Sequence, residues 1–424
     1  MTTTAPLPRS TARPRPNPGR PFTPVSPSGR LLAAAAPGLA EHLRRNGPPP
    51  SPSADLPDLV EAAGLTGRGG AAFPTWRKLA SVGARPIVIA NGAEGEPASG
   101  KDAWLLRSAP HLVLDGLGLV AGSVGASRAY AYAPPGPGAA RLRAALAERG
   151  REPVPVEVVE AVDGFLAGEA SAVAARVAGL PARPRDKAVR LSEAGVRGRP
   201  TLVHNVETLA HVAQIARYGP GWFRRVGTPD EPGTFLATLS GAVARPGVRE
   251  AAFGTTLAGL AAMAGGLTGP VAAFLVGGYH GRWVPADAGA GLGLTPGPRP
   301  SGLAVGAGVV IALPASSCGL GASAAILRYL AEQSAGACGP CRLGLPALAD
   351  AFAELAGRGN PRAAVSAARL AGLVAGRGAC HNPDGAARLA RSALEVFADD
   401  VALHQTGRCQ ARSGRPASRG SAQR

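Results

Sequence analysis

Residues 64–75 read GLTGRGGAAFPT, and Lys78 follows three positions later. Four glycines surround Arg68 just before a possible helix start. A loop of this kind lets main-chain N–H groups approach a phosphate that side chains would otherwise block. The guanidinium of Arg68 adds a fork of donors suited to phosphate oxygens. Because the chain contains 59 glycines, this segment alone is also consistent with a flexible turn.

A second glycine-rich loop follows the next apolar run. Residues 86–90 (PIVIA) predict a short buried strand, and residues 91–97 (NGAEGEP) come directly after it. The amide of Asn91 and the carboxylates of Glu94 and Glu96 could accept hydrogen bonds from the ribityl or amide groups of a ligand. An exposed acidic surface loop is the alternative interpretation.

Alternation of strands and helices continues through the first half of the chain. Residues 129–133 and 155–161 read as further strands with a helix at 139–149 between them, and residues 111–124 read as a helix. This order predicts an α/β layer with a parallel sheet. Ligands of such sheets bind beyond the carboxyl ends of the strands, where both glycine-rich loops would lie.

The second half of the chain predicts a different order of secondary-structure elements. Residues 234–248 read as strand, turn and strand, followed by a helix at 256–264 and a strand at 271–276, which predicts a compact α+β unit. From Leu320 onward the chain is helical and predicts an antiparallel bundle. The expected helices are 320–333, 343–357, 362–375 and 384–404.

The cysteines indicate metal or redox chemistry. Cys338 and Cys341 form a C-x-x-C at a helix break, and Cys380 follows 39 positions later. Thiolates at such spacings hold iron–sulfur clusters or zinc, and inert buried thiols are the third possibility. In the predicted bundle these three cysteines share one end, and Cys318 and Cys409 share the opposite end.

The net charge of +17 raises the possibility of nucleic-acid binding. However, residues 1–30 and 408–424 each carry five arginines and no acidic residue, so much of the excess lies in Pro-, Ser- and Arg-rich ends that we expect to be disordered. We therefore predict no nucleic-acid partner. Glycine and proline interrupt the apolar stretches at 251–279 and 303–327, which favours buried strands and helices over membrane spans.

In this order the motifs resemble those of the NADH-binding flavoprotein subunit of respiratory complex I and of its relatives in soluble NAD-linked hydrogenases and formate dehydrogenases. The resemblance runs from about residue 54 to residue 408. The matching positions are 64–75 with Lys78; Asn91, Glu94, Glu96, Pro97, Lys101 and Asp102; 198–208 with two substitutions; and Ser240, Gly241, 245–248 and 254–257.

The resemblance implies an α/β fold with three units and two tails. A Rossmann-like FMN- and NAD(P)H-binding domain would come first, then a ubiquitin-like α+β domain of the SLBB type, then a four-helix iron–sulfur domain. The expected boundaries are 1–29 for a disordered tail, 30–229, 230–314 and 315–408 for the three domains, and 409–424 for a disordered basic tail.

The resemblance also implies the cofactors and their ligands: FMN, NAD(H) or NADP(H), and one iron–sulfur cluster of the [4Fe-4S] type. Glu96 and Lys78 would act beside the nicotinamide. The implied cofactor-binding residues are Gly67, Arg68, Gly69, Gly70, Phe73, Lys78, Asn91, Glu94, Glu96, Gly168, Glu169, Lys187, Val203, His204, Asn205 and Thr208. The implied cluster ligands are Cys338, Cys341 and Cys380.

The implied activity is that of an NADH dehydrogenase-like oxidoreductase, which passes electrons from NAD(P)H through FMN and the cluster to a protein acceptor. We expect a hetero-oligomer containing a separate iron–sulfur carrier, either a thioredoxin-like [2Fe-2S] subunit or a ferredoxin. We expect a cytoplasmic location, with the inner face of the membrane reached only through partners.

Several positions depart from the family pattern. Ala335 stands where the first cluster cysteine belongs, which leaves three options: a [3Fe-4S] cluster, a [4Fe-4S] cluster completed by His381 or an outside ligand, or no cluster. We favour the second. Ala93 and Ala170 replace acidic residues of the nucleotide site.

Ser81 and Arg190 stand where the family places aromatic rings against the adenine. Two further hypotheses therefore stay open. One is a flavin and iron–sulfur relay, linked to ferredoxin, that no longer oxidises NADH. The other is a non-enzymatic scaffold or ligand-binding subunit that uses the SLBB region.

Overall fold

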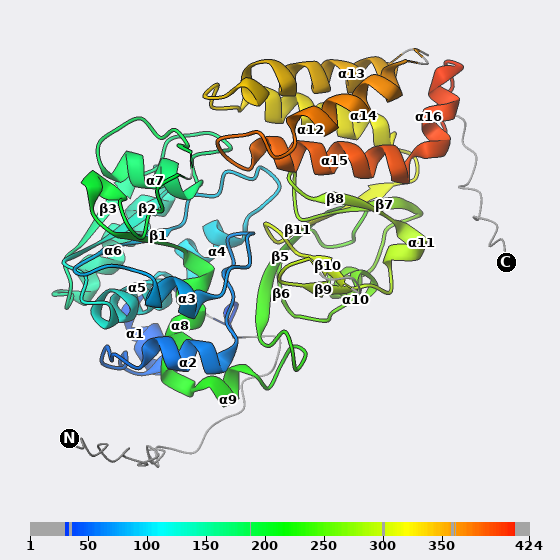
Figure 1. Ribbon diagram of the computed structural model, residues 1–424. Coiled ribbons are helices and arrows are strands. Elements are labelled where there is room, and N and C mark those ends of the chain that lie inside the picture. The colour runs from blue at the N-terminus through cyan, green and yellow to red at the C-terminus, as the bar shows by residue number, and fades with distance from the viewer. Residues whose placement is uncertain are drawn as a thin grey trace, which may run out of the picture.

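The computed structural model describes residues 30–411, apart from 34–35, 187, 299–301, 358–359 and 361. The predicted tail at 1–29, residues 412–424 of the predicted tail at 409–424, and the predicted site residue Lys187 lie outside the described residues. Figure 1 shows an α/β unit beside a second sheet, with the helices of the C-terminal region lying across that sheet.

The first sheet has four parallel strands in the order β3-β2-β1-β4. The strands are β1 (Ile87–Asn91), β2 (Arg128–Ala133), β3 (Val156–Glu160) and β4 (Thr201–Asn205). The prediction of a parallel α/β layer is confirmed, and so are the first three strands. The fourth was missed, because its five residues include a histidine and an asparagine and show no apolar run.

Nine helices of the described residues accompany this sheet. Their bounds are α1 (Leu39–Asn46), α2 (Leu56–Ala63), α3 (Thr75–Ala80), α4 (Lys101–Ser108), α5 (Pro110–Ser123), α6 (Pro137–Arg149), α7 (Ala170–Val177), α8 (Val206–Tyr218) and α9 (Pro220–Phe223). Period-2 alternation in β1 sends Val88 and Ala90 into a core with α5 and α8, and Ile87 and Ile89 into a smaller core with α7.

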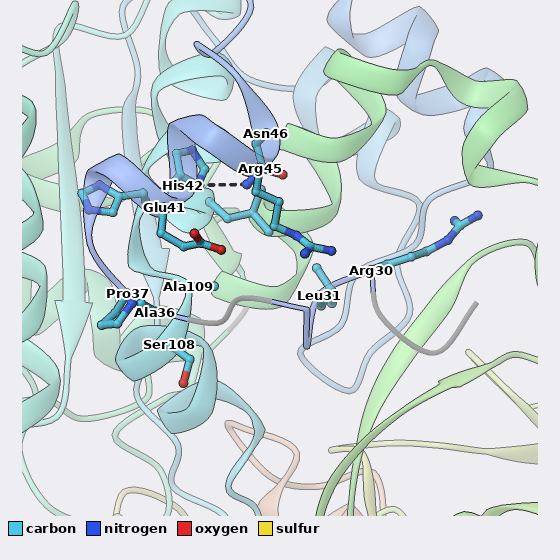
Figure 2. Close-up of a pocket in the computed structure, with 12 residues that line it drawn as sticks. Arg30, Leu31, Ala36, Pro37, Glu41, His42, Arg45, Asn46, Ser108 and Ala109 are labelled. Atoms are coloured by element: carbon cyan, nitrogen blue, oxygen red, sulfur yellow. Dashed lines mark hydrogen bonds between the residues drawn. The ribbon is translucent and has the colours of Figure 1, made fainter. Parts of the chain in front are cut away.

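The segment before and including α1 is fastened to the α/β unit by polar contacts. The guanidinium of Arg30 donates to the carbonyl oxygens of Trp222 at 2.8 Å and Phe223 at 3.1 Å. On α1, Asn46 Nδ2 lies 3.1 Å from His42 Nδ1 (Figure 2). The cavity drawn there measures about 20 Å³, which has room for about one water molecule rather than a cofactor.

The second sheet has five strands in the order β6-β5-β11-β7-β8. β11 pairs in parallel with β5, and the other neighbours are antiparallel. The bounds are β5 (Thr234–Gly241), β6 (Gly247–Ala252), β7 (Val271–Val276), β8 (Arg282–Pro285) and β11 (Val309–Pro314), with α10 (Leu257–Met263), α11 (Ala286–Gly289) and the short pair β9 (Gly293–Thr295) and β10 (Gly302–Ala304). The predicted strand–turn–strand, helix and strand are confirmed.

Helices of the C-terminal region pack on this second sheet. They are α12 (Gly319–Glu332), α13 (Leu345–Gly357), α14 (Ala363–Val374), α15 (Asn382–Val396) and α16 (Ala398–Gln405), with a π turn at Pro340–Gly344. Trp283 of β8 donates through its main-chain N–H to Ser392 Oγ at 3.0 Å and through Nε1 to Ser323 Oγ at 2.9 Å. These contacts join the sheet to α15 and α12.

The prediction of one helix over 384–404 is wrong, because the chain turns at Phe397 and forms two helices. Phe397 has φ −107° and ψ 31° and packs edge-on against Trp283, with ring centroids 5.3 Å apart. Burial of this ring against the sheet therefore outweighs continuation of the helix. Within the described residues, every helix falls short of the length and apolarity that crossing a bilayer requires.

Candidate functional site

A cavity of about 1000 Å³ joins the carboxyl end of the first sheet, the second sheet and the start of α15. The predicted site residues that line it are Arg68, Gly69, Gly70, Asn91, Glu94, Glu96, Gly168, Glu169, Asn205 and Cys380. The predicted residues that do not line it are Gly67, Phe73, Lys78, Val203, His204, Thr208, Cys338 and Cys341.

Two asparagines meet at the carboxyl ends of β1 and β4. Asn91 and Asn205 are partners in the parallel register. Asn205 Oδ1 accepts from the N–H of Glu207 at 3.0 Å and so caps α8. Asn91 Nδ2 donates to the carbonyl oxygen of Gly168 at 2.9 Å. Residues predicted from separate sequence motifs therefore lie together at the carboxyl edge of the first sheet.

A buried ion cluster that we did not select from the sequence lies below this edge. Lys101 Nζ lies 2.8 Å from Asp102 Oδ1 and 3.0 Å from Glu207 Oε2. It also donates to Asn205 Oδ1 at 3.2 Å. Lys101, Asp102 and Glu207 each expose 4% or less of their surface. The two carboxylates raise the pKa of Lys101 although burial alone would lower it, so the ammonium stays charged.

The side chain of Arg68, predicted to bind a phosphate, makes several contacts within the protein. Its Nη1 donates to the carbonyl oxygen and hydroxyl of Thr66, both at 2.8 Å, and its Nε donates to Thr234 O at 3.3 Å. The guanidinium also lies 4.6 Å from the centre of the Phe253 ring. Nη1 therefore holds the glycine-rich loop itself, Nε and the guanidinium face contact the second sheet, and the buried Nη2 has no hydrogen-bond partner in the structure.

Lys78 and His204 lie behind the cavity. Lys78 Nζ donates to the carbonyl oxygen of Val203, and burial lowers the pKa of Lys78 to about 8. His204 exposes 3% of its surface, and burial together with the charge of Lys78 lowers its pKa well below the usual value. His204 is therefore a neutral side chain at this place. Phe73 is 53% exposed.

The three predicted glutamates all accept main-chain hydrogen bonds. Glu94 accepts from the N–H groups of Asp102 at 3.2 Å and Ala103 at 3.1 Å, which caps α4. Glu169 accepts from the N–H of Ser171 at 2.8 Å and caps α7. Glu96 Oε2 accepts from the N–H of Tyr279 at 2.7 Å, and burial raises the pKa of Glu96 to about 7.

Two glycines let the loops of the α/β unit close on each other. A Cβ on Gly95 would lie 2.2 Å from the carbonyl oxygen of Phe165, and a Cβ on Gly168 would lie 2.9 Å from that of Ala93. No side chain fits at either distance. These loops therefore need glycine for their close approach.

The three predicted cluster cysteines gather at one end of the helices. Cys338 lies in the turn after α12, Cys341 in the π turn and Cys380 just before α15. Burial and the thiols of Cys338 and Cys380 raise the pKa of Cys341 to about 12. The side chain of His381 is 75% exposed, and its Nδ1 lies 3.2 Å from Asp384 Oδ2.

The remaining cysteines lie at the other end of the helices, as predicted. Cys318 and Cys409 come together with α16, and Figure 1 shows α16 at the end of the helical region away from α7. The predicted tail, however, begins too early. Cys409 exposes 8% of its surface, and the N–H of Gln410 donates to Asp400 Oδ1 at 2.9 Å.

A group of rings at the cavity wall was also missed, near the segments of Cys338, Cys341 and Cys380, which we together call the cysteine turn. Phe165 lies edge-on to His280, with centroids 4.6 Å apart, and to Tyr329 at 6.0 Å. The main-chain N–H of Phe165 donates to Gln333 Oε1 at 3.1 Å, directly before the cysteine segment. No motif joins these residues in the sequence, because they come from three separate regions.

Family models match two parts of the chain. Residues 60–214 match the Nuo51 FMN-binding domain, and residues 321–404 match the NADH-ubiquinone oxidoreductase-F iron-sulfur binding region. The structure is similar to that of an NAD⁺-reducing [NiFe]-hydrogenase in the H₂-reduced state, with a TM-score of 0.76 and 29% identity. The match covers 84% of this chain and 65% of the hydrogenase chain.

Curated relatives match over most of their length. The second F subunit of NADH-quinone oxidoreductase in Rhizobium meliloti is 30% identical over 401 residues, which cover 89% of this chain and 95% of the relative. The corresponding F subunit of Mycobacterium bovis is 30% identical over 390 residues, covering 84% of this chain and 86% of the relative. The ordered glycine loops, the cysteine turn and these long similarities lead to one conclusion: the chain belongs to the family of NADH-quinone oxidoreductase F subunits.

Proposed function

We propose that this chain is the electron-entry subunit of an NADH- or NADPH-oxidising complex, an oxidoreductase that uses FMN and an iron–sulfur cluster. The observation that carries the proposal is the cavity of about 1000 Å³. It brings Asn91 and Asn205, at the carboxyl ends of two parallel strands, into the same space as Cys380 of the cysteine turn. This supports a flavin site next to a metal centre.

The residues present fit FMN. Gly69 and Gly70 offer main-chain N–H groups at the cavity wall, Arg68 keeps one buried nitrogen without a partner, and Lys101 brings a positive charge to the same wall. Asn91, Glu94 and Asn205 add amide and carboxylate groups for the ribityl and ring polar atoms. FMN, when bound, accepts a hydride as two electrons and gives them up singly.

The chain's own contribution is positioning. Glu96 holds the loop after β7 through Tyr279 N–H, and we propose that its carboxyl group faces the nicotinamide nucleotide. Lys78 braces β4 from behind through the carbonyl oxygen of Val203. We retain Phe73 and Lys187 as proposed nucleotide contacts, and Gly67, Val203, His204, Gly168, Glu169 and Thr208 as the frame of the flavin site.

The cysteine turn supplies three thiolates for a cluster. We propose a [4Fe-4S] cluster held by Cys338, Cys341 and Cys380, with His381 or a group outside the chain as the fourth ligand. His381 supports this because it adjoins Cys380 and its side chain is exposed. Soft thiolate donors together with imidazole are a known ligand set for iron–sulfur centres.

The remaining assignments are proposals on the same basis. The five-stranded sheet with α10 supports a ubiquitin-like SLBB domain at 230–314, between an FMN-binding domain at 30–229 and an iron–sulfur domain at 315–408. The chain would work in a hetero-oligomer with a separate iron–sulfur carrier. It would be cytoplasmic and reach the membrane only through partners.

Anaerobic purification followed by visible spectroscopy tests this function. We expect a flavin spectrum with an iron–sulfur background, bleaching by NADH or NADPH, and diaphorase activity with an artificial acceptor. Protein that stays colourless after reconstitution with FMN, iron and sulfide would reject the proposal. It would leave the non-enzymatic scaffold as the better hypothesis.

The relay that no longer oxidises NADH is kept as a second candidate. Ser81 and Arg190, at the positions where the family has aromatic rings, are both exposed and form no aromatic shelf for an adenine. Aromatic stacking is worth about 0.5–1.5 kcal/mol per ring pair. Reduction of the flavin by a reduced ferredoxin, but by neither nicotinamide nucleotide, would favour this candidate.

Replacing Glu96 with Gln should change how stability depends on pH. The pKa of Glu96 is about 7 in the folded protein, against an ordinary value of 4.5, so the folded state keeps a proton that the unfolded chain has lost. In the wild type this group lowers the free energy of unfolding as pH rises from about 4.5 to 7, on the order of 1–3 kcal/mol.

Urea unfolding at about pH 5 and about pH 8 measures this effect. The free energy of unfolding of Glu96→Gln should fall less between these two pH values than that of the wild type. Glu61→Gln, at an exposed position on α2, should show the same fall as the wild type. If the free energy of unfolding of Glu96→Gln changed with pH as that of the wild type does, the raised pKa of Glu96 would be contradicted.

Replacing Gly95 with Ala should loosen the flavin site. The added Cβ would meet the carbonyl oxygen of Phe165 at 2.2 Å, so the two loops must separate. Overpacking of this kind costs about 1–3 kcal/mol, which corresponds to roughly 5- to 150-fold weaker FMN binding if the strain falls on the bound form. Fluorescence titration of apo-protein with FMN measures the change.

Gly100→Ala is the matched control for this prediction. Gly100 lies at the end of the same loop, and its Cβ would come no closer than 3.7 Å to the side chain of Val248. It should bind FMN as the wild type does. Equal FMN affinities for the two variants would show that loop closure is not needed for binding.

A further inference from the structure

A cluster of four metal-ligating side chains lies at the end of the helical region away from the cysteine turn. Cys318 caps the N-terminus of α12, Asp400 and His404 lie one turn apart on α16, and Cys409 follows that helix. One ligand atom of each lies within 4.8 Å of those of the other three. Cys318 Sγ and His404 Nε2 are 3.5 Å apart.

Three of the four side chains are buried, and hydrogen bonds from main-chain N–H groups hold two of the four in place. Asp400, His404 and Cys409 expose 6%, 5% and 8% of their surface. Asp400 is held by the N–H of Gln410, which donates to its Oδ1 at 2.9 Å. Cys318 Sγ accepts from the N–H of Gly321 at 3.3 Å. Hydrogen bonds of this kind fix the direction in which a metal ligand presents its donor atom.

We infer that Cys318, Asp400, His404 and Cys409, whose ligand atoms lie within 4.8 Å of one another, form a structural zinc site. Two thiolates, one imidazole and one carboxylate are a tetrahedral donor set that suits Zn²⁺. Zinc bonds of about 2.0–2.3 Å imply ligand atoms about 3.3–3.8 Å apart. The present separations therefore need to close by only about 1 Å. Among the described residues, no other group of three or more such side chains gathers as tightly.

The site would join segments that are far apart in the chain. Cys318 begins the helical region just after β11, and Asp400, His404 and Cys409 end it. A metal bound to both stabilises the folded state in proportion to the logarithm of its concentration over its dissociation constant. The site lies away from Cys338, Cys341 and Cys380, so it is independent of the flavin and of the iron–sulfur cluster.

Metal analysis of the full chain tests the inference. Protein purified without chelator should contain one zinc ion per chain, in addition to iron. Cys409→Ser and Asp400→Ala should lose the zinc and keep the iron. Asp399→Ala, at an exposed neighbouring position on the same helix, is the matched control and should keep both metals. Loss of a hydrogen-bond partner of a metal ligand weakens metal binding roughly 10- to 100-fold. Loss of a ligand itself should weaken zinc binding by at least as much.

A second variant separates this site from zinc bound by chance to the cluster cysteines. The triple variant Cys338→Ser, Cys341→Ser, Cys380→Ser should keep its zinc, and Co²⁺ substitution should give a thiolate-to-cobalt absorption band. Zinc that disappears with the triple variant but survives Cys409→Ser would overturn the inference. Wild-type protein that is isolated without zinc, and that instead carries a Cys318–Cys409 disulfide by mass spectrometry under non-reducing conditions, would overturn it as well.

If Cys409→Ser does not fold, the wild type still decides the question. Removal of metal by a chelator should lower the midpoint of thermal unfolding, and added Zn²⁺ should restore it with a stoichiometry of one. Wild-type protein that holds no zinc as purified, and whose unfolding midpoint responds to neither chelator nor added Zn²⁺, would reject the site.

Discussion

Lys101→Met is expected to destabilise the protein by about 3–5 kcal/mol and to abolish FMN binding, because it leaves buried carboxylates without their counter-charge. Lys101 lies 2.8 Å from Asp102 and 3.0 Å from Glu207, and each of the three residues exposes 4% or less of its surface. Methionine keeps most of the volume of the lysine stem, so the loss of charge is separated from the creation of a cavity.

The pH dependence of this variant distinguishes the mechanism. Burial already raises the pKa of Glu207 in the presence of Lys101, and loss of the ammonium should raise that pKa further. The carboxyl groups then take up protons on folding, so the destabilisation of Lys101→Met should shrink as the pH falls. Urea unfolding at several pH values and FMN titration of the refolded apo-protein measure both effects.

Arg107→Ala is the control for Lys101→Met. Arg107 is exposed near the end of the same helix, α4, and its loss removes one positive charge without uncovering a buried carboxylate. We expect stability within about 0.5 kcal/mol of the wild type and normal FMN binding. If Lys101→Met unfolded at the same urea concentration as Arg107→Ala, the ion cluster would not have the role proposed for it.

Cys341→Ser is expected to remove the iron–sulfur cluster while leaving the flavin reducible. Cys341 exposes 3% of its surface and lies next to Cys338 and Cys380. Serine is similar in size but a poor ligand for iron, so the iron content should fall from about four atoms per chain to near zero. Electron delivery to the protein acceptor should fall by about tenfold or more, because electrons can leave the flavin only by slower routes.

Iron analysis, electron paramagnetic resonance and stopped-flow flavin reduction separate these outcomes. Cys318→Ser should keep its iron, since Cys318 lies at the opposite end of the helices. Full iron content in Cys341→Ser would remove this cysteine from the ligand set. Loss of iron together with loss of FMN would show that the two sites are not separable in this chain.

Local signals in the sequence predicted the strands of the two sheets that have clear apolar runs and the longer C-terminal helices, but not α4 or α7. The run PIVIA predicted β1, and the alternation around it predicted a parallel sheet, because apolar period and length are properties of each segment alone. β4 and the short strands β8, β9 and β10 were not predicted. They have three to five residues and owe their conformation to neighbouring strands rather than to their own composition.

Some residues of the candidate site could be predicted from the sequence, and some of their contacts could not. Glycine motifs and the C-x-x-C are recognisable because each function needs particular residue types at a fixed spacing. The partnership of Lys101 with Glu207 is not recognisable, since 106 positions separate them along the chain. Arg68 is predicted to bind a phosphate, and the structure shows what its position in the chain could not: Nε donates to Thr234 of the second sheet, and Nη1 donates to Thr66 of its own loop.

The features that can be read from the chain alone are encoded locally: the order of the motifs, the two glycine loops, the three cysteines proposed as cluster ligands, and the placing of Cys318 and Cys409 at one end of the bundle. Three other features emerge only on folding: which charges are buried together, where the last long helix breaks, and the convergence of four ligand-type side chains beside α16. The physical reason is that hydrogen bonds, burial and charge pairing act over a few ångströms in space, and folding brings together residues whose separation along the chain carries no signal.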